Sequence, residues 1–254
     1  MRNTTFLPSR SMTKDDVLEM IRDSYRFAQK LDPEAEPGYD LTFDTTIEDW
    51  RTACDLVPAK KLGRALNAWF GVHFSDPVWR SALEPAKEAT LRGVCELVAS
   101  MANKPDIREF PVLGTECLSA GVFLTIRSTL AEGGVPVAGV RPSTPLEPKS
   151  WKHVGPLIHA MGRIAPDVLP VPEMHYRRSY KMCWWIFFVG LLMMFLWVGI
   201  GFAVAATGFA SAAAFGLPGQ VFERVSFPGM KTFRDLTEAI ISSTHKNSRI
   251  VRSE

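Results

Sequence analysis

The sequence predicts an α+β fold: a small N-terminal helical bundle, a small strand–helix–strand unit, one transmembrane helix and a short helical tail. Three observations support this class. Capped amphipathic patterns recur over residues 13–103. Two short apolar runs flank a helical pattern in residues 104–146. Residues 182–222 contain no Asp, Glu, Lys or Arg. We expect residues 1–12 to be a flexible N-terminus and residues 147–182 to be a connector with a basic end.

The N-terminal region, residues 13–103, is expected to contain four or five short helices joined by loops. Thr13 suits the start of the first helix, because its hydroxyl can accept a hydrogen bond from the free N–H groups of the first turn. Gly71 suits a helix end, because glycine adopts the left-handed conformation that commonly follows one. The expected helix boundaries lie at Thr13, Thr46, Leu62, Gly71, Pro77 and Thr90.

The residues from Asp55 onward carry a family pattern. Asp55-Leu56 precedes a helix ending in Phe70-Gly71, and a loop and a Thr-headed helix follow. This spacing resembles acyl carrier proteins, over residues 13–101, and it implies a carrier-like helical domain. In that family a serine that holds phosphopantetheine follows the aspartate, whereas Leu56 stands here. The resemblance therefore implies no attachment point, and we expect no cofactor.

The helix that is acidic in carrier proteins is basic here. Lys60, Lys61 and Arg64 form a local cluster on it. This cluster could bind the acidic surface of a partner protein, and a solvated helix face is the alternative interpretation. Residues 13–101 as a whole are mildly acidic, so binding of nucleic acid through bulk charge is not expected.

The middle region has a different hydrophobic pattern from the N-terminal helices. Residues 107–113 are expected to form a strand, 119–131 a helix and 135–140 a second strand. Two strands alone cannot cover both of their faces. This unit is therefore expected to pack on the preceding helices, on another copy of the chain, or on a partner.

Residues 183–206 are apolar and long enough to cross about 30 Å of hydrocarbon as one helix. Tryptophans at its start suit the headgroup level, and the basic residues before it could contact anionic lipid. The expected membrane-interface residues are Arg177, Arg178, Lys181, Trp184 and Trp185. The apolar run continues to about residue 219, which leaves a tight hairpin open as an alternative to a single span. Residues 220–254 are expected to be a tail with an amphipathic helix over 232–243.

Basic residues are more frequent before the span than after it, which favours a cytoplasmic N-terminal domain in an inner or plasma membrane. Small residues also recur at four-residue spacing within the span, and such a stripe could pack helices in a homodimer. The members of this stripe are Gly199, Gly201, Ala203 and Ala205.

The sequence gives no support to several classes of function. Lys plus Arg is 29 and Asp plus Glu is 27, for a net charge of +2, which does not suggest a nucleic-acid partner. The four cysteines form no CxxC pair, and no HExxH, GxGxxG or GxSxG motif occurs. We therefore expect no metal site and no evident catalytic site. An enzyme with scattered site residues remains open, and a pocket that holds His153 or His159 beside a carboxylate would favour it.

These observations favour a single-pass, membrane-anchored interaction or adaptor protein with a cytoplasmic N-terminal domain. Membrane lipids and a protein partner or a second copy are the expected partners. The alternatives are a membrane-bound accessory protein of acyl-chain or carrier-protein chemistry and a hairpin-anchored membrane protein.

Overall fold

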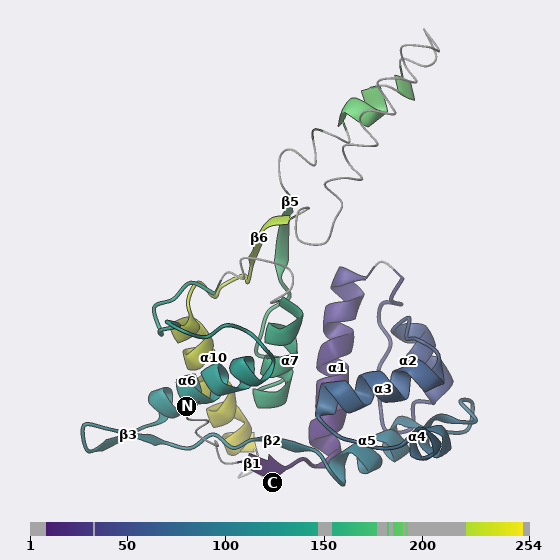
Figure 1. Cartoon of the computed structure of the whole chain (residues 1–254), viewed down its shortest axis with the longest axis horizontal. Helices are drawn as coiled ribbons and strands as arrows, with labels where there is room; N and C mark the ends of the chain where they lie inside the picture. Colours follow the sequence, from purple (N-terminus) through teal and green to yellow (C-terminus); the bar gives the residue numbers. More distant parts are fainter. Residues whose placement is uncertain are drawn as a thin grey trace.

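The computed structural model describes residues 9–32, 34–146, 154–176, 182, 185–189, 191–192 and 222–250. Most of the described residues form two helical lobes with separate hydrophobic cores (Figure 1). The first lobe contains β1 (Ser9–Ser11), α1 (Lys14–Leu31), α2 (Ile47–Ala53), α3 (Ala59–Phe70), α4 (Asp76–Leu83), α5 (Leu91–Ala99) and β2 (Asn103–Pro105). The second lobe contains β3 (Phe110–Val112), β4 (Thr115–Cys117), α6 (Leu118–Glu132), α7 (Val154–Ile164), β5 (Glu173–Tyr176), β6 (Phe222–Ser226) and α10 (Phe233–Ile250).

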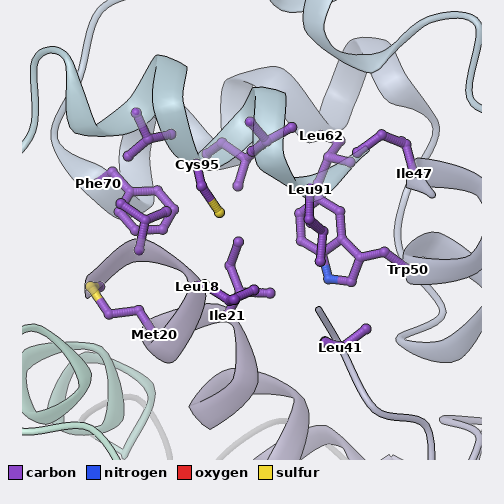
Figure 2. Close-up of a cluster of buried hydrophobic side chains, with 14 of the residues drawn as sticks. Leu18, Met20, Ile21, Leu41, Ile47, Trp50, Leu62, Phe70, Leu91 and Cys95 are labelled. Carbon is purple, nitrogen blue, oxygen red and sulfur yellow. The ribbon is translucent and has the colours of Figure 1, made fainter. Parts of the chain in front are cut away.

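The first lobe is a bundle around one apolar core. The side chains that converge in it come from α1, α2, α3 and α5 (Figure 2). They recur at helical spacing, so each helix turns one apolar face inward. The central members of this core are Leu18, Ile21, Ile47, Trp50, Leu62, Phe70, Leu91 and Cys95.

Capping residues set two of the helix boundaries that the sequence predicts, whereas α3 begins at Ala59 rather than at the expected Leu62. The Thr13 hydroxyl accepts the Asp16 N–H at 3.1 Å, and the Asp16 carboxylate accepts the Thr13 N–H at 2.9 Å. This reciprocal capping box satisfies two backbone donors that the first turn leaves free. Gly71 ends α3 with a φ of 67°, in the left-handed region. The predicted positions of Thr13 and Gly71 are confirmed.

The second lobe forms where α6, α7 and α10 pack together. α10 contacts α6, and α6 contacts α7. Helix α1 lies between the lobes (Figure 1), and its Phe27 is buried in the second core while Ile21 is buried in the first. A shared helix of this kind joins the two lobes.

The predicted helix over 119–131 is confirmed by α6, but the two strands predicted around it are wrong. Residues 107–113 do not form one strand, because the chain reverses at Leu113 and Gly114 into a β3–β4 hairpin. Residues 135–140 form turns and irregular backbone, and Val135, Val137 and Val140 pack against the second core. Pro136 has no backbone N–H to donate to a strand ladder. The apolar character of this run therefore reflects side-chain burial rather than strand pairing.

A second correction concerns the predicted transmembrane helix. In the part of the chain that the structure describes, no helix is long and apolar enough to cross a bilayer. A span needs about 20 helical residues, and within 183–206 the structure describes only the helical residues 185–189 and 191–192. The remaining residues of that range lie outside the described ones. The finding goes against the transmembrane and single-pass assignments and against the membrane localisation derived from them.

The placement of the tail is also different from the prediction. A single span would place the tail across a membrane from the N-terminal domain, but α10 packs on α6. Its Leu236 and Ile240 are almost fully buried in the second core. β5 and β6 pair in antiparallel fashion, which brings residues 176 and 222 together. The predicted amphipathic helix over 232–243 is confirmed, and α10 extends it to residue 250.

Candidate interaction surfaces

An apolar groove runs between the lobes. It has a volume of about 720 Å³ and is bounded by α3 of the first lobe and by α6 and α7 of the second. Its apolar lining includes Leu56, Leu62, Trp69, Pro156 and Ala160. A concave apolar site of this size is a common place for a ligand or a partner side chain to bind.

His159 and Trp69 lie together in this groove. Their rings are 5.8 Å apart in an edge-to-face arrangement, which aromatic quadrupoles favour. Burial lowers the pKa of His159 below its usual value of 6.5. His159 is nonetheless exposed to solvent, so its imidazole is a polar group on a largely apolar wall.

Polar groups gather at one end of the groove. Arg163 lies 3.7 Å from the Glu132 carboxylate and donates a hydrogen bond of 3.2 Å to the backbone carbonyl of Asn103. These contacts hold Arg163 between the two lobes. His159 thus shares a groove with the carboxylate of Glu132, but the structure records an aromatic contact for this histidine rather than a hydrogen bond to a carboxylate. The described contacts of His159 therefore include no carboxylate that would orient it as a general base.

The β3–β4 hairpin is the second surface. Phe110 pairs with Cys117, and Val112 pairs with Thr115, so Leu113 and Gly114 form a two-residue turn. Both turn residues have positive φ, 50° and 82°, as a type I′ turn requires. Leucine rarely adopts this conformation, whereas glycine, asparagine and aspartate do.

The tip of this hairpin is apolar and exposed. Leu113 is 102% exposed, Phe110 is 45% exposed and Val112 is 42% exposed. In Figure 1 the hairpin extends away from α6 at one end of the molecule. We use the term hairpin tip for Phe110, Val112 and Leu113. Exposed apolar side chains beside a backbone conformation that leucine rarely adopts mark the hairpin tip as a candidate binding surface.

The base of the hairpin is held close to α6. A Cβ on Gly121 would lie 1.8 Å from the carbonyl oxygen of Arg108. Only glycine permits this close approach. The segment that leads into β3 therefore lies directly against α6. This contact fixes the position of the hairpin base.

Two carboxylates flank the hairpin tip. Glu109 and Glu116 are both exposed. The hydrogen bond with Glu116, followed by burial and by the charge of Glu116, raises the pKa of Glu109. Two carboxyl groups this close repel when both are ionised, so Glu109 takes up a proton more readily than a lone glutamate does.

The structure brings one of the predicted partner-binding residues to the groove. Lys60, Lys61 and Arg64 are exposed on α3, and Arg64 lies 3.6 Å from the Asp76 carboxylate. Lys61 is one turn before Ala65 and two turns before Ala68, which both line the groove. Residues at this spacing share a helix face. Lys61 therefore borders the groove on the α3 side, whereas Lys60 lines a separate pocket with Asp76 and Glu84.

Other predicted site residues fall outside the described part of the chain. Trp185 is described and is 72% exposed. The predicted membrane-interface residues Arg177, Arg178, Lys181 and Trp184 and the predicted helix-packing residues Gly199, Gly201, Ala203 and Ala205 lie outside the described residues.

A further exposed apolar surface lies within residues 182–192. Met182, Ile186 and Leu192 are among its exposed members. Most of the residues around it in sequence lie outside the described part of the chain.

The positions that carry the acyl carrier resemblance take part in the groove. Asp55 adopts a φ of 45° just before α3, and Leu56 packs against the first core and lines the groove. The place of the carrier serine is thus occupied by an apolar side chain. The resemblance stays a prediction. Within the described residues, no three His, Cys, Asp or Glu side chains gather as a metal site would require.

Comparison with known proteins adds no relative. The chain matches no protein-family model, no curated protein and no solved structure. The assignment of function therefore depends on the geometry of the two surfaces.

The sequence analysis missed both surfaces. The groove forms between α3 and α7, which are far apart in sequence, so local patterns carry no signal for it. The hairpin had a signal, because Leu113-Gly114 is a residue pair that can reverse a strand, and reading 107–113 as a single strand concealed it.

Proposed function

We propose that this chain is an interaction protein that binds a protein partner through its hairpin tip. The observation that carries the proposal is the apolar, exposed turn at Leu113. A single exposed leucine is ordinary on a protein surface. Here Leu113 also occupies a left-handed turn position and adjoins Phe110 and Val112, so exposure, backbone conformation and clustering coincide.

The energetics support binding at this surface. Burial of one large apolar side chain contributes about 1.5–3 kcal/mol. The hairpin tip offers three such side chains on a short arm that Gly121 and Arg108 hold against α6. Because the arm is ordered before binding, less conformational entropy is lost when a partner covers the tip. A partner is expected to supply an apolar pocket with a basic rim, since Glu109 and Glu116 flank the tip.

Photo-crosslinking tests the proposal. A benzophenone amino acid at position 113 in the full chain should form a discrete adduct in cells that express the protein. Excess unlabelled wild-type protein should suppress the adduct, and excess Leu113→Asp protein should not. The matched control places the same group at Val57, an exposed apolar position in the first lobe.

Equal adduct yields at positions 113 and 57 would refute an interaction role for the hairpin tip. So would suppression of the adduct by Leu113→Asp protein as strongly as by wild type. The first result would show a general surface reactivity, and the second would show that the leucine contributes nothing to recognition.

A further inference from the structure

We propose that the hairpin tip of one copy of this chain binds in the groove of a second copy. This inference rests on the proposed function and names the partner. The groove is apolar and open, and the hairpin tip is apolar and exposed. Two paired strands lie about 4.8 Å apart, which is narrow enough for a hairpin end to enter a groove between helices.

The hairpin tip cannot occupy the groove of its own chain. In Figure 1 the hairpin lies beyond α6 at one end of the molecule, whereas α3 lies on the other side of α7 and α1. The Arg108–Gly121 contact holds the hairpin base in that position. A contact between these two surfaces therefore requires a second molecule.

Charge complementarity favours the second copy as the occupant. The hairpin brings the carboxylates of Glu109 and Glu116. Lys61 is exposed on α3 and shares a helix face with Ala65 and Ala68, which line the groove. Glu132 also lines the groove, but Arg163 already lies 3.7 Å from it. The docked hairpin would place its acidic flank near Lys61, one of the residues that the sequence marks as a partner-binding candidate.

The geometry of this contact sets the form of the assembly. The hairpin tip and the groove are different surfaces, so the contact is heterologous, and it builds head-to-tail chains or closes into a ring. The contact area is small, which is typical of a weak and reversible interface. Association is therefore expected to depend on protein concentration.

Complementary variants test this arrangement. Leu113→Asp removes the apolar tip and is compatible with the turn, because aspartate tolerates positive φ. Ala68→Glu places a carboxylate in the groove at an exposed helix position. Ala131→Glu makes the same change at an exposed position of α6 that does not line the groove. All variants keep the full chain, and circular dichroism verifies that each is folded.

Sedimentation velocity over a concentration series gives the readout. Wild type and Ala131→Glu should associate as concentration rises, as head-to-tail chains or as a closed ring. Leu113→Asp and Ala68→Glu should each remain monomeric. An equimolar mixture of these two should form dimers and nothing larger, because one supplies an intact hairpin and the other an intact groove. The inference is overturned if the mixture stays monomeric or if either variant alone associates as wild type does.

The two proposals can fail separately. If wild type is monomeric at all concentrations and the crosslink at position 113 still forms a saturable adduct with another protein, the second-copy partner is refuted and the interaction role stands. If the crosslink at 113 does not exceed the control at Val57, the interaction role itself is refuted.

Discussion

Replacement of Arg26 by Met is predicted to weaken the junction of the two lobes. The Asp23 side chain is 4% exposed and accepts hydrogen bonds from Arg26 Nε at 3.1 Å and Nη2 at 2.6 Å. The Asp167 N–H donates to the same Asp23 oxygen at 3.2 Å, and Arg26 donates to the Leu169 carbonyl at 2.7 Å. These bonds join α1 to the segment that follows α7. Their loss leaves a buried carboxylate with one backbone donor.

The expected magnitude follows from the burial of the pair. Removal of one partner from a fully buried ion pair costs about 3–5 kcal/mol. The Arg26 side chain is 31% exposed, and solvent screens part of the interaction, so the expected loss in the free energy of unfolding is about 2–3 kcal/mol at pH 7.

The loss should depend on pH. Burial raises the pKa of Asp23 above 3.8, and the hydrogen bonds and charge of Arg26 oppose that rise. Without Arg26 the pKa rises further. A carboxyl whose folded pKa exceeds its unfolded value contributes its full stability below the unfolded pKa and loses it as pH rises through the folded pKa. The Arg26→Met variant should therefore lose most stability at pH 7 and less at about pH 4.5.

Urea unfolding of wild type, Arg26→Met, Asp23→Asn and the double variant at both pH values measures these effects. The double variant should be more stable at pH 7 than Arg26→Met alone, because its buried group is uncharged. The reasoning is refuted if Arg26→Met loses the same free energy at both pH values and the two single losses simply add in the double variant.

Three other outcomes are expected. Leu130→Ala, which empties a site 1% exposed in the second core, should lower the free energy of unfolding by about 2–5 kcal/mol in urea titration; a loss below about 1 kcal/mol would contradict the packing. Gly71→Ala should lower the free energy of unfolding by about 1–2 kcal/mol in thermal unfolding, because Gly71 has a φ of 67°. The control Gly93→Ala lies in a helix with open space around it. It should raise the free energy of unfolding by about 0.5–1 kcal/mol. Burial raises the pKa of Cys95 to about 12, so mass spectrometry after thiol alkylation of the native protein should find Cys117 modified before Cys95; equal rates would contradict the placement of Cys95.

Local chemistry made some elements predictable. The start of α1 at Thr13 and the end of α3 at Gly71 depend on residues within a few positions of each boundary. The amphipathic helix over 232–243 likewise has its cap and its apolar stripe in adjacent sequence. Such features are readable because capping and helical periodicity act over one or two turns.

Errors arose where one local pattern suits two structures. Residues 135–140 have the apolar and β-branched composition of a strand. Among the described residues they pair with no strand, and their valines pack on the second core. Residues 107–113 reverse at Leu113 because the following Gly114 completes a two-residue turn. Strand formation depends on a partner elsewhere in the chain, so composition alone does not decide it.

The sequence by itself determined which segments are helical in the first lobe and where the caps at Thr13 and Gly71 lie. Only the tertiary structure decided that Phe27 and Ile21 of one helix enter different cores, that α10 packs on α6, and that α3 and α7 enclose an apolar groove. The physical reason is the distance along the sequence over which each interaction acts. Caps and periodicity act between neighbouring residues, whereas cores and grooves form by burial of apolar surface between segments that are distant in sequence.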